Sequence, residues 1–258
     1  MTETAAPQAP DGQRAEAARA PILAARGLTF AYPGRATLLD GLDFGLRAGE
    51  RLGLMGHNGT GKTTLFLALM GLLRPQAGSV LFKGREVRSE ADFAGLRRHV
   101  GLLFQNADDQ LFSPTVLEDV AFGPLNLGQP PAKARETAVR TLATLGLAGF
   151  EERVTHKLSG GEKRLAALAC VLAMEPEALL LDEPTTGLDP ETRDRLVGIL
   201  CGLPVSYVII SHDLDFLERT TSQLCAMEHG KVDCSPRLSI HRHAHVHVHG
   251  DTPHVHKD

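Results

Sequence analysis

One segment of the sequence has residue types and spacing suited to holding a phosphate group. Residues 56–63 read Gly-His-Asn-Gly-Thr-Gly-Lys-Thr, which matches the pattern GxxxxGK[ST] in full. Glycines let the chain curve so that successive N–H groups face an anion, and a helix starting there adds its positive end. We expect Lys62 to reach the β- and γ-phosphates of ATP and the Thr63 hydroxyl to bind Mg²⁺. The candidate nucleotide-binding residues of this loop are Gly56, Asn58, Gly59, Gly61, Lys62, Thr63 and Thr64.

A pair of carboxylates further along the chain supplies the complementary chemistry. Residues 179–184 read Leu-Leu-Leu-Asp-Glu-Pro, an apolar strand that delivers Asp182 and Glu183 at its end. Open α/β sheets bind their ligands at the carboxyl ends of the strands. We expect Asp182 to hold the water shell of the Mg²⁺ and Glu183 to act as general base on the attacking water. Without the phosphate loop upstream, the same pair would be an ordinary strand end.

Secondary-structure signals around these residues predict an α/β fold with a mostly parallel sheet. Arg51–Met55 is a candidate strand before the phosphate loop, and Thr63–Leu73 has helical spacing after it. Candidate strands at Ala178–Leu181 and Val205–Ile210 flank a helix at Pro190–Leu200, and this alternation favours parallel pairing. Short runs at residues 28–32, 42–47 and 80–82 predict an additional antiparallel β layer. Residues from about 106 to 175 predict an inserted helical lobe.

Residues 158–164, Leu-Ser-Gly-Gly-Glu-Lys-Arg, resemble the signature motif of the ABC ATPases, a resemblance that extends over about residues 22 to 233. The resemblance implies that Ser159 and the N–H groups of Gly160 and Gly161 cap the γ-phosphate held by a second subunit. The residues agree with it, because Ser-Gly-Gly before an apolar helix forms a helix N-terminus with exposed amides. Glu162 departs from the pattern, since many relatives have glutamine there.

Four further positions match ABC ATPase motifs in the expected order. The resemblance makes Gln105 the Q-loop glutamine, which touches Mg²⁺ or water, and Asp189 part of the D-loop along the dimer seam. His212 matches the switch histidine that contacts the γ-phosphate, and Tyr32 matches the aromatic residue that stacks on adenine. Without the resemblance, Gln105 and His212 would be ordinary polar residues and Tyr32 a β-layer core residue.

Residues 104–116 and 118–124 are similar to the energy-coupling-factor class of importers, and most similar to its cobalt and nickel branch. This resemblance implies a pair of ATPase subunits, identical or merely similar, a transmembrane coupling protein and a small membrane protein that captures the substrate. It also implies that the lobe around Asp108 to Pro124 receives the coupling helices, at the cytoplasmic face of the membrane.

Histidine dominates the segment after Pro236. Alternate residues of an extended chain lie on one side, so the first five imidazoles can form a row that chelates a divalent metal. Imidazole suits nickel, cobalt, copper and zinc. We expect this segment to bind Ni²⁺ or Co²⁺. The alternative interpretations are that the segment is dispensable or that it was added for purification. The candidate ligands are His241, His243, His245, His247, His249, His254 and His256.

Composition limits the remaining alternatives. The 258 residues are 43% apolar, so we expect one sizeable domain (22–235) between a flexible leader (1–21) and the tail (236–258). Because the net charge is −4, we expect no nucleic-acid partner. The four cysteines lack CxxC spacing, and we expect all of them to be reduced thiols. A vitamin importer ATPase, a soluble ABC ATPase without transport and a metal-storage protein are the competing functions.

Overall fold

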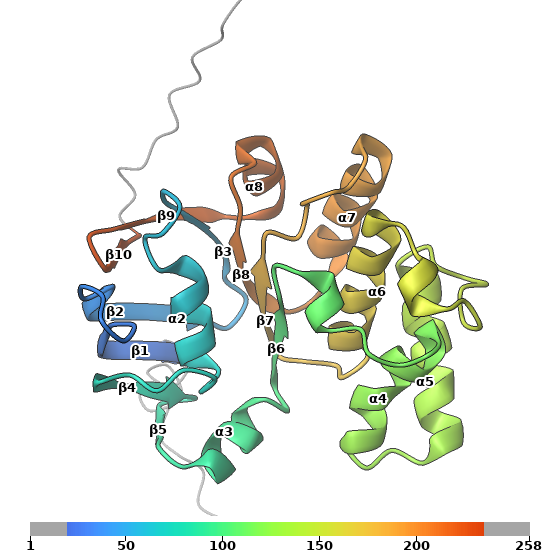
Figure 1. Cartoon of the computed structure of the whole chain (residues 1–258), viewed down its shortest axis with the longest axis horizontal. Helices are drawn as coiled ribbons and strands as arrows, with labels where there is room; N and C mark the ends of the chain where they lie inside the picture. Colours follow the sequence, from blue (N-terminus) through green and yellow to red (C-terminus); the bar gives the residue numbers. More distant parts are fainter. Residues whose placement is uncertain (1–19, 235–258) are drawn as a thin grey trace, which may run out of the picture.

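A computed structural model of the chain describes residues 20–234 and shows two sheets side by side with a group of helices (Figure 1). The smaller sheet is antiparallel, with the strand order β2-β1-β4-β5. Its pairing joins segments from both sides of the phosphate loop, since β1 pairs with β2 before the loop and with β4 after it. The strands are β1 (Pro21–Phe30), β2 (Leu39–Arg47), β4 (Ala77–Phe82) and β5 (Arg85–Val87).

The larger sheet has six strands in the order β10-β9-β3-β8-β7-β6, and only β10 runs antiparallel to its neighbour. Every residue of β6, β7 and β8 is buried, as expected for parallel strands covered on both faces. The carboxyl ends of β3, β7 and β8 therefore lie next to one another. The strands are β3 (Arg51–Met55), β6 (Val100–Leu103), β7 (Ala178–Asp182), β8 (Ser206–Ile210), β9 (Gln223–Glu228) and β10 (Lys231–Asp233).

Most of the helices fall into two groups. Helices α4, α5 and α6 pack on one another to form the expected helical lobe, at the right of Figure 1. Helix α2 follows the phosphate loop, and α7 and α8 alternate with the strands of the larger sheet. The helices are α2 (Lys62–Leu69), α3 (Glu90–Leu96), α4 (Val116–Asn126), α5 (Pro131–Thr144), α6 (Gly160–Leu172), α7 (Pro190–Gly202) and α8 (Leu214–Thr220), with 3₁₀ turns at Ala107–Asp109 and Thr155–Lys157.

Two buried clusters hold these layers together. One lies between the antiparallel sheet, α2 and one face of the parallel sheet. The other joins the opposite face of that sheet to α4, α5, α6, α7 and α8. The predicted α/β class, with its antiparallel layer and helical lobe, is confirmed. Between residues 20 and 234, no helix is long and apolar enough to cross a membrane.

One predicted helix ends earlier than its apolar spacing indicates. Helix α2 stops at Leu69, whereas the pattern predicted helix as far as Leu73. Gly71 adopts φ +66°, the left-handed conformation that commonly ends a helix. A Cβ at this position would lie 2.4 Å from the ring of Phe93, so a close tertiary contact also requires the glycine.

Candidate active site

The phosphate loop joins the end of β3 to the start of α2. Gly61 is the N-cap of α2 with φ +103°, and Gly56 has φ +152°. A Cβ at Gly56 would lie 2.5 Å from the carbonyl oxygen of Met227 on β9, so the neighbouring strand excludes a side chain there. The glycines of the motif therefore permit both the curvature of the loop and its close approach to the sheet.

Lys62 places its ammonium group inside the curve of this loop. Its Nζ donates hydrogen bonds to the carbonyl oxygens of Gly56 (2.6 Å) and His57 (3.0 Å). Burial lowers the pKa of Lys62, and the charges of Glu183 and Asp182 oppose this shift. The positive charge thus lies at the phosphate loop, where it can meet the terminal phosphates of ATP.

Oxygen donors suited to magnesium meet next to Lys62. The Thr63 hydroxyl donates to Oδ2 of Asp182 at 2.7 Å, which joins the start of α2 to the end of β7. Burial raises the pKa of Asp182, opposed by the hydrogen bond from Thr63 and the charges of Arg164 and Lys62. Gln105, just after β6, lines the same cavity. Hydroxyl, carboxylate and amide oxygens fit Mg²⁺, which would neutralise phosphate charge during hydrolysis.

Glu183 follows β7 directly and has an unusual environment. Its φ of +48° is left-handed, and its N–H donates to the carbonyl oxygen of Ile210 on β8 at 2.9 Å. Its Oε1 is buried without a hydrogen-bond partner among the described residues and lies 3.5 Å from Nε2 of His212. Burial raises the pKa of Glu183, while nearby His212 acts in the opposite direction. Glu183 also lines the cavity, where a carboxylate is suited to taking a proton from water.

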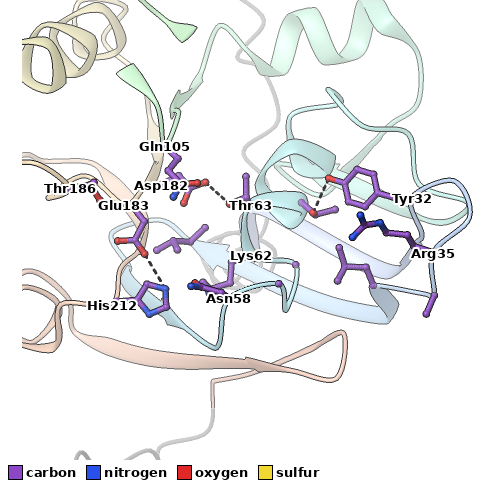
Figure 2. A pocket seen from close by; sticks show the side chains of 16 residues that line it. Tyr32, Arg35, Asn58, Lys62, Thr63, Gln105, Asp182, Glu183, Thr186 and His212 are labelled. Atoms are coloured by element: carbon purple, nitrogen blue, oxygen red, sulfur yellow. Dashed lines mark hydrogen bonds and ion pairs between the residues drawn. The ribbon is translucent and has the colours of Figure 1, made fainter. Parts of the chain in front are cut away.

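These groups surround one cavity of about 740 Å³, drawn in Figure 2. Tyr32 stands at its rim, 37% exposed, and its hydroxyl forms a hydrogen bond with Oγ1 of Thr64 at 3.2 Å. The ring of Tyr32 also packs edge-on against Phe30. Its accessible face can stack on a base. The predicted residues that line this cavity are Tyr32, Asn58, Gly59, Gly61, Lys62, Thr63, Thr64, Gln105, Asp182, Glu183 and His212.

Four other predicted residues line a separate cavity of about 450 Å³: Ser159, Gly160, Gly161 and Asp189. Ser159 is the N-cap of α6. Its N–H donates to Oε2 of Glu162 at 2.7 Å, and its hydroxyl accepts from the Glu162 N–H. This backbone hydrogen bond is the main reason that the pKa of Glu162 lies below its usual value. Glu162 therefore caps the helix, a task that glutamine can also perform.

The two signature glycines are not required by packing within the described chain. A Cβ at Gly160 would meet no neighbouring atom within 4 Å, and one at Gly161 would lie 3.5 Å from Leu188. Neither has a positive φ. Their open amides at the N-terminus of α6 are suited to an anion that comes from outside the chain.

The model of the family "ABC transporter" matches residues 39–186, from the start of β2 to just past Glu183. The chain belongs to the ABC transporter family. Its ATP-binding domain makes the protein an ATPase, and the binding of ATP with Mg²⁺ follows from the same match.

Known relatives of this ABC ATPase extend over most of its length. A putative ABC transporter ATP-binding protein of Nitratidesulfovibrio vulgaris is 55% identical, with 92% of this chain and 86% of the relative covered. The cobalt import ATP-binding protein CbiO of Rhodobacter capsulatus is 46% identical, with 82% and 77% covered. The solved structure of CbiO1 from Clostridium perfringens, part of the CbiONQ complex, has a TM-score of 0.73 at 34% identity, with 83% and 87% covered. The predicted resemblance to cobalt-branch ATPases is confirmed.

Some cavity residues of the ABC ATPase were not predicted. Arg35, Ala36 and Leu38 line the nucleotide cavity from the turn after Tyr32, and Thr186 lines it from the D-loop. Thr186 lies three residues before Asp189 in the sequence Thr-Gly-Leu-Asp, so its position was a usable signal. The turn after Tyr32 contains no motif that would have identified its members.

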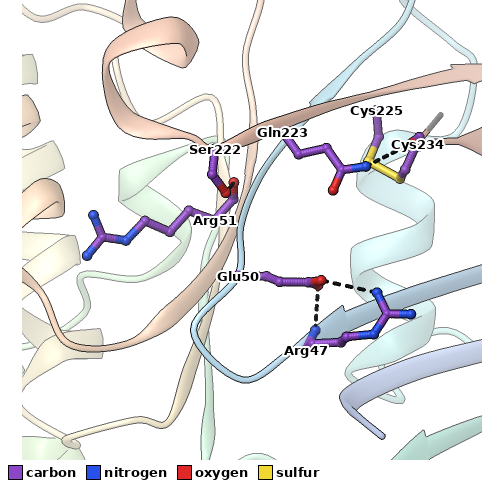
Figure 3. Close-up of a disulfide and its surroundings, with 7 residues drawn as sticks. All are labelled: Arg47, Glu50, Arg51, Ser222, Gln223, Cys225 and Cys234. Carbon is purple, nitrogen blue, oxygen red and sulfur yellow. Dashed lines mark hydrogen bonds and ion pairs between the residues drawn. A yellow bond between two sulfur atoms is a disulfide. The ribbon is translucent and has the colours of Figure 1, made fainter. Parts of the chain in front are cut away.

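The last hairpin of the cassette contains a disulfide between Cys225 and Cys234 (Figure 3). Strands β9 and β10 pair Asp233 with Ala226, so the next pair along the hairpin is Cys234 and Cys225. The expectation of four reduced thiols is therefore wrong for these two, while Cys170 and Cys201 are free. The absence of CxxC spacing does not exclude a disulfide, because the hairpin register brings together cysteines nine positions apart.

We expect two thiols per chain to react with a thiol reagent in denaturant without reductant, and four after reduction. Closing a loop of this length removes unfolded-state entropy, so reduction lowers the free energy of unfolding by about 2–3 kcal/mol in the chain-entropy model. Denaturant titrations with and without reductant measure this difference. Four reactive thiols before reduction would contradict the pairing.

Proposed function

We propose that this ABC ATPase powers import of nickel or cobalt through an energy-coupling-factor transporter, as a peripheral subunit at the cytoplasmic face of the membrane. Its proposed partners are a transmembrane coupling protein and a membrane protein that captures the metal. The name of the cobalt import relative supports the substrate, and CbiO1 of the CbiONQ complex supports the assembly. The distinctive segment at residues 104–124 supports the transporter class.

An apolar groove next to the nucleotide cavity carries the proposal of a membrane partner. The groove of about 280 Å³ lies where β6 meets α4 and α6, and Phe104 and Leu72 contribute to its lining. Phe112 (66% exposed) and Phe122 (46% exposed) stand at it with their rings edge to face, 4.8 Å between centroids. Exposed aromatic side chains grouped at a groove mark a protein contact. We propose that the coupling helices of the transmembrane coupling protein bind in this groove.

The separation of the two cavities supports a dimer. One chain contains the phosphate loop and Glu183 in the first cavity, and Ser159 with Asp189 in the second. Two chains in head-to-tail contact would bring the signature of each subunit to the ATP of the other. The second ATPase subunit is another copy of this chain or a similar subunit.

The histidine-rich segment lies outside the described residues, so its support is chemical. Imidazole nitrogen is a good ligand for Ni²⁺ and Co²⁺. Within residues 20–234, no group of three His, Cys, Asp or Glu side chains is placed to bind a metal ion. We propose that the tail binds the imported metal at the cytoplasmic face, and that binding is lost as the imidazoles protonate below roughly pH 6.

Uptake of labelled Ni²⁺ and Co²⁺ by native cells under metal-poor conditions tests the transport function. Three chains are compared: the unaltered one, Glu183→Gln, and a chain that lacks residues 239–258. We expect Glu183→Gln to abolish uptake of one of the two metals. We expect the shortened chain to transport that metal but to change its accumulation or the tolerance of the cells.

Unchanged uptake of both metals in Glu183→Gln cells that lack other importers would contradict the substrate. A shortened chain with the same accumulation and tolerance as the full chain would contradict the proposed role of the tail. The two outcomes are independent, because the deletion leaves every residue of the nucleotide cavity in place.

A further inference from the structure

One buried guanidinium group connects three segments of the cassette. Arg164, on the first turns of α6, is 3% exposed. Its Nη1 donates to the carbonyl oxygen of Phe104 at 2.6 Å. Its Nη2 donates to the carbonyl oxygens of Gln105 and Glu183, both at 2.7 Å. Arg164 is the last residue of the signature segment at residues 158–164.

The three acceptors belong to different functional parts of the molecule. Phe104 lines the proposed docking groove, whereas Gln105 and Glu183 line the nucleotide cavity. Arg164 lines neither cavity itself. Its helix is capped by Ser159, which lines the second cavity. A single side chain therefore links the groove, the catalytic carboxylate and the signature helix through main-chain oxygens.

The backbone of Glu183 adopts a left-handed conformation that such contacts can hold in place. A left-handed conformation in a residue other than glycine costs about 1–3 kcal/mol and persists only where surrounding contacts enforce it. The N–H of Glu183 is fixed by Ile210 on β8, and its carbonyl oxygen is fixed by Arg164. These two hydrogen bonds hold the peptide groups on both sides of the Glu183 Cα and so set the direction of its side chain.

We propose that Arg164 is a positioning residue for ATP hydrolysis. It fixes the main chain of Glu183 and connects it by hydrogen bonds to the signature helix and to the groove residue Phe104. This role rests on the proposed function of Glu183 as the base. A movement of α6 would reach Glu183 through the same guanidinium. Because Arg164 does not line the nucleotide cavity, it contributes to turnover and not to ATP binding.

Lysine at this position separates geometry from charge. Arg164→Lys keeps a positive charge beside Asp182 and Glu183, but one ammonium nitrogen cannot occupy the positions of both Nη1 and Nη2. A displaced general base loses much of its 10²- to 10⁴-fold effect. We expect kcat to fall at least tenfold, while KM and the Kd for a fluorescent ATP analogue stay within about twofold. Arg140→Lys is the matched control, because Arg140 pairs with exposed Glu175 on the surface.

A double-mutant cycle with Glu183→Gln shows whether Arg164 acts through Glu183. If it does, adding Arg164→Lys to Glu183→Gln lowers the residual kcat by less than twofold. A full tenfold further loss would overturn the proposal, as would unchanged kcat in the single variant. If both Arg164→Lys and Arg164→Gln melt far lower and lose ATP binding, Arg164 has only a structural role and the proposal fails.

The failure of this inference differs from the failure of the proposed base. Normal turnover by Glu183→Gln alone would remove Glu183 from catalysis. An inactive Glu183→Gln together with a fully active Arg164→Lys would remove only Arg164.

Discussion

Glu183→Gln should bind MgATP normally and hydrolyse it at least about 100-fold more slowly, because general-base catalysis contributes 10²- to 10⁴-fold. The amide is similar in size to the carboxylate, so the cavity keeps its shape, but it cannot accept the proton of the attacking water. Steady-state turnover and binding of a fluorescent ATP analogue measure the two effects separately. Turnover within about twofold of the unaltered chain would exclude Glu183 as the base.

Glu175→Gln is the control for Glu183→Gln, because it makes the same chemical change at a residue with a similar backbone conformation. Glu175 also has a left-handed φ, +52°, but it lies on the surface in an ion pair with Arg140. We expect full turnover from this variant.

As the pH falls, the unaltered chain should lose ATPase activity at a higher pH than it would if its base were an exposed glutamate. Burial raises the pKa of Glu183, and only the ionised carboxylate can act as a base.

Lys62→Ala should weaken ATP binding by about 10- to 100-fold, since a hydrogen bond to a charged group contributes about 1.5–3 kcal/mol. The ammonium group of Lys62 lies within the loop, next to Gly56 and His57, and alanine leaves no charge to meet the β- and γ-phosphates. Calorimetric titration with MgATP measures the change in Kd.

Lys133→Ala is the control for the loss of one lysine. Lys133 lies on α5 and pairs with Glu136 at the surface. Its loss should leave both Kd and kcat unchanged. A Lys62→Ala chain that binds ATP as tightly as this control would contradict the assignment of residues 56–63 as the phosphate loop.

The parts of the fold and site that the sequence predicts are those determined by local patterns. The strand predicted at Arg51–Met55 has the same limits in the structure, because a turn and the phosphate loop bound it on either side. The strand that ends at Asp182 is one residue longer than predicted. Cavity residues were predicted because the motif spacing identifies them and parallel strands bring their carboxyl ends together.

The features that were missed depend on contacts that no spacing pattern in the sequence defines. The acceptors of Arg164 are 60, 59 and 19 positions away from it, and no spacing rule connects them. The disulfide between Cys225 and Cys234 follows from the register of one hairpin, which residue types alone do not define. Gly71 follows the end of α2 in a left-handed conformation, and the ring of Phe93 excludes a side chain there, a contact that the apolar pattern does not reveal.

The ATPase rate per chain as a function of chain concentration tests most directly whether the two separate cavities complete one another across a dimer. The oligomeric state is followed by light scattering in the same samples. If the two cavities complete one another across a dimer, the ATPase rate per chain rises with concentration in step with the ATP-dependent dimer. The rate then vanishes where only monomer remains. A constant rate per chain at concentrations where the protein is monomeric would contradict the account, because the signature cavity would then have no part in hydrolysis.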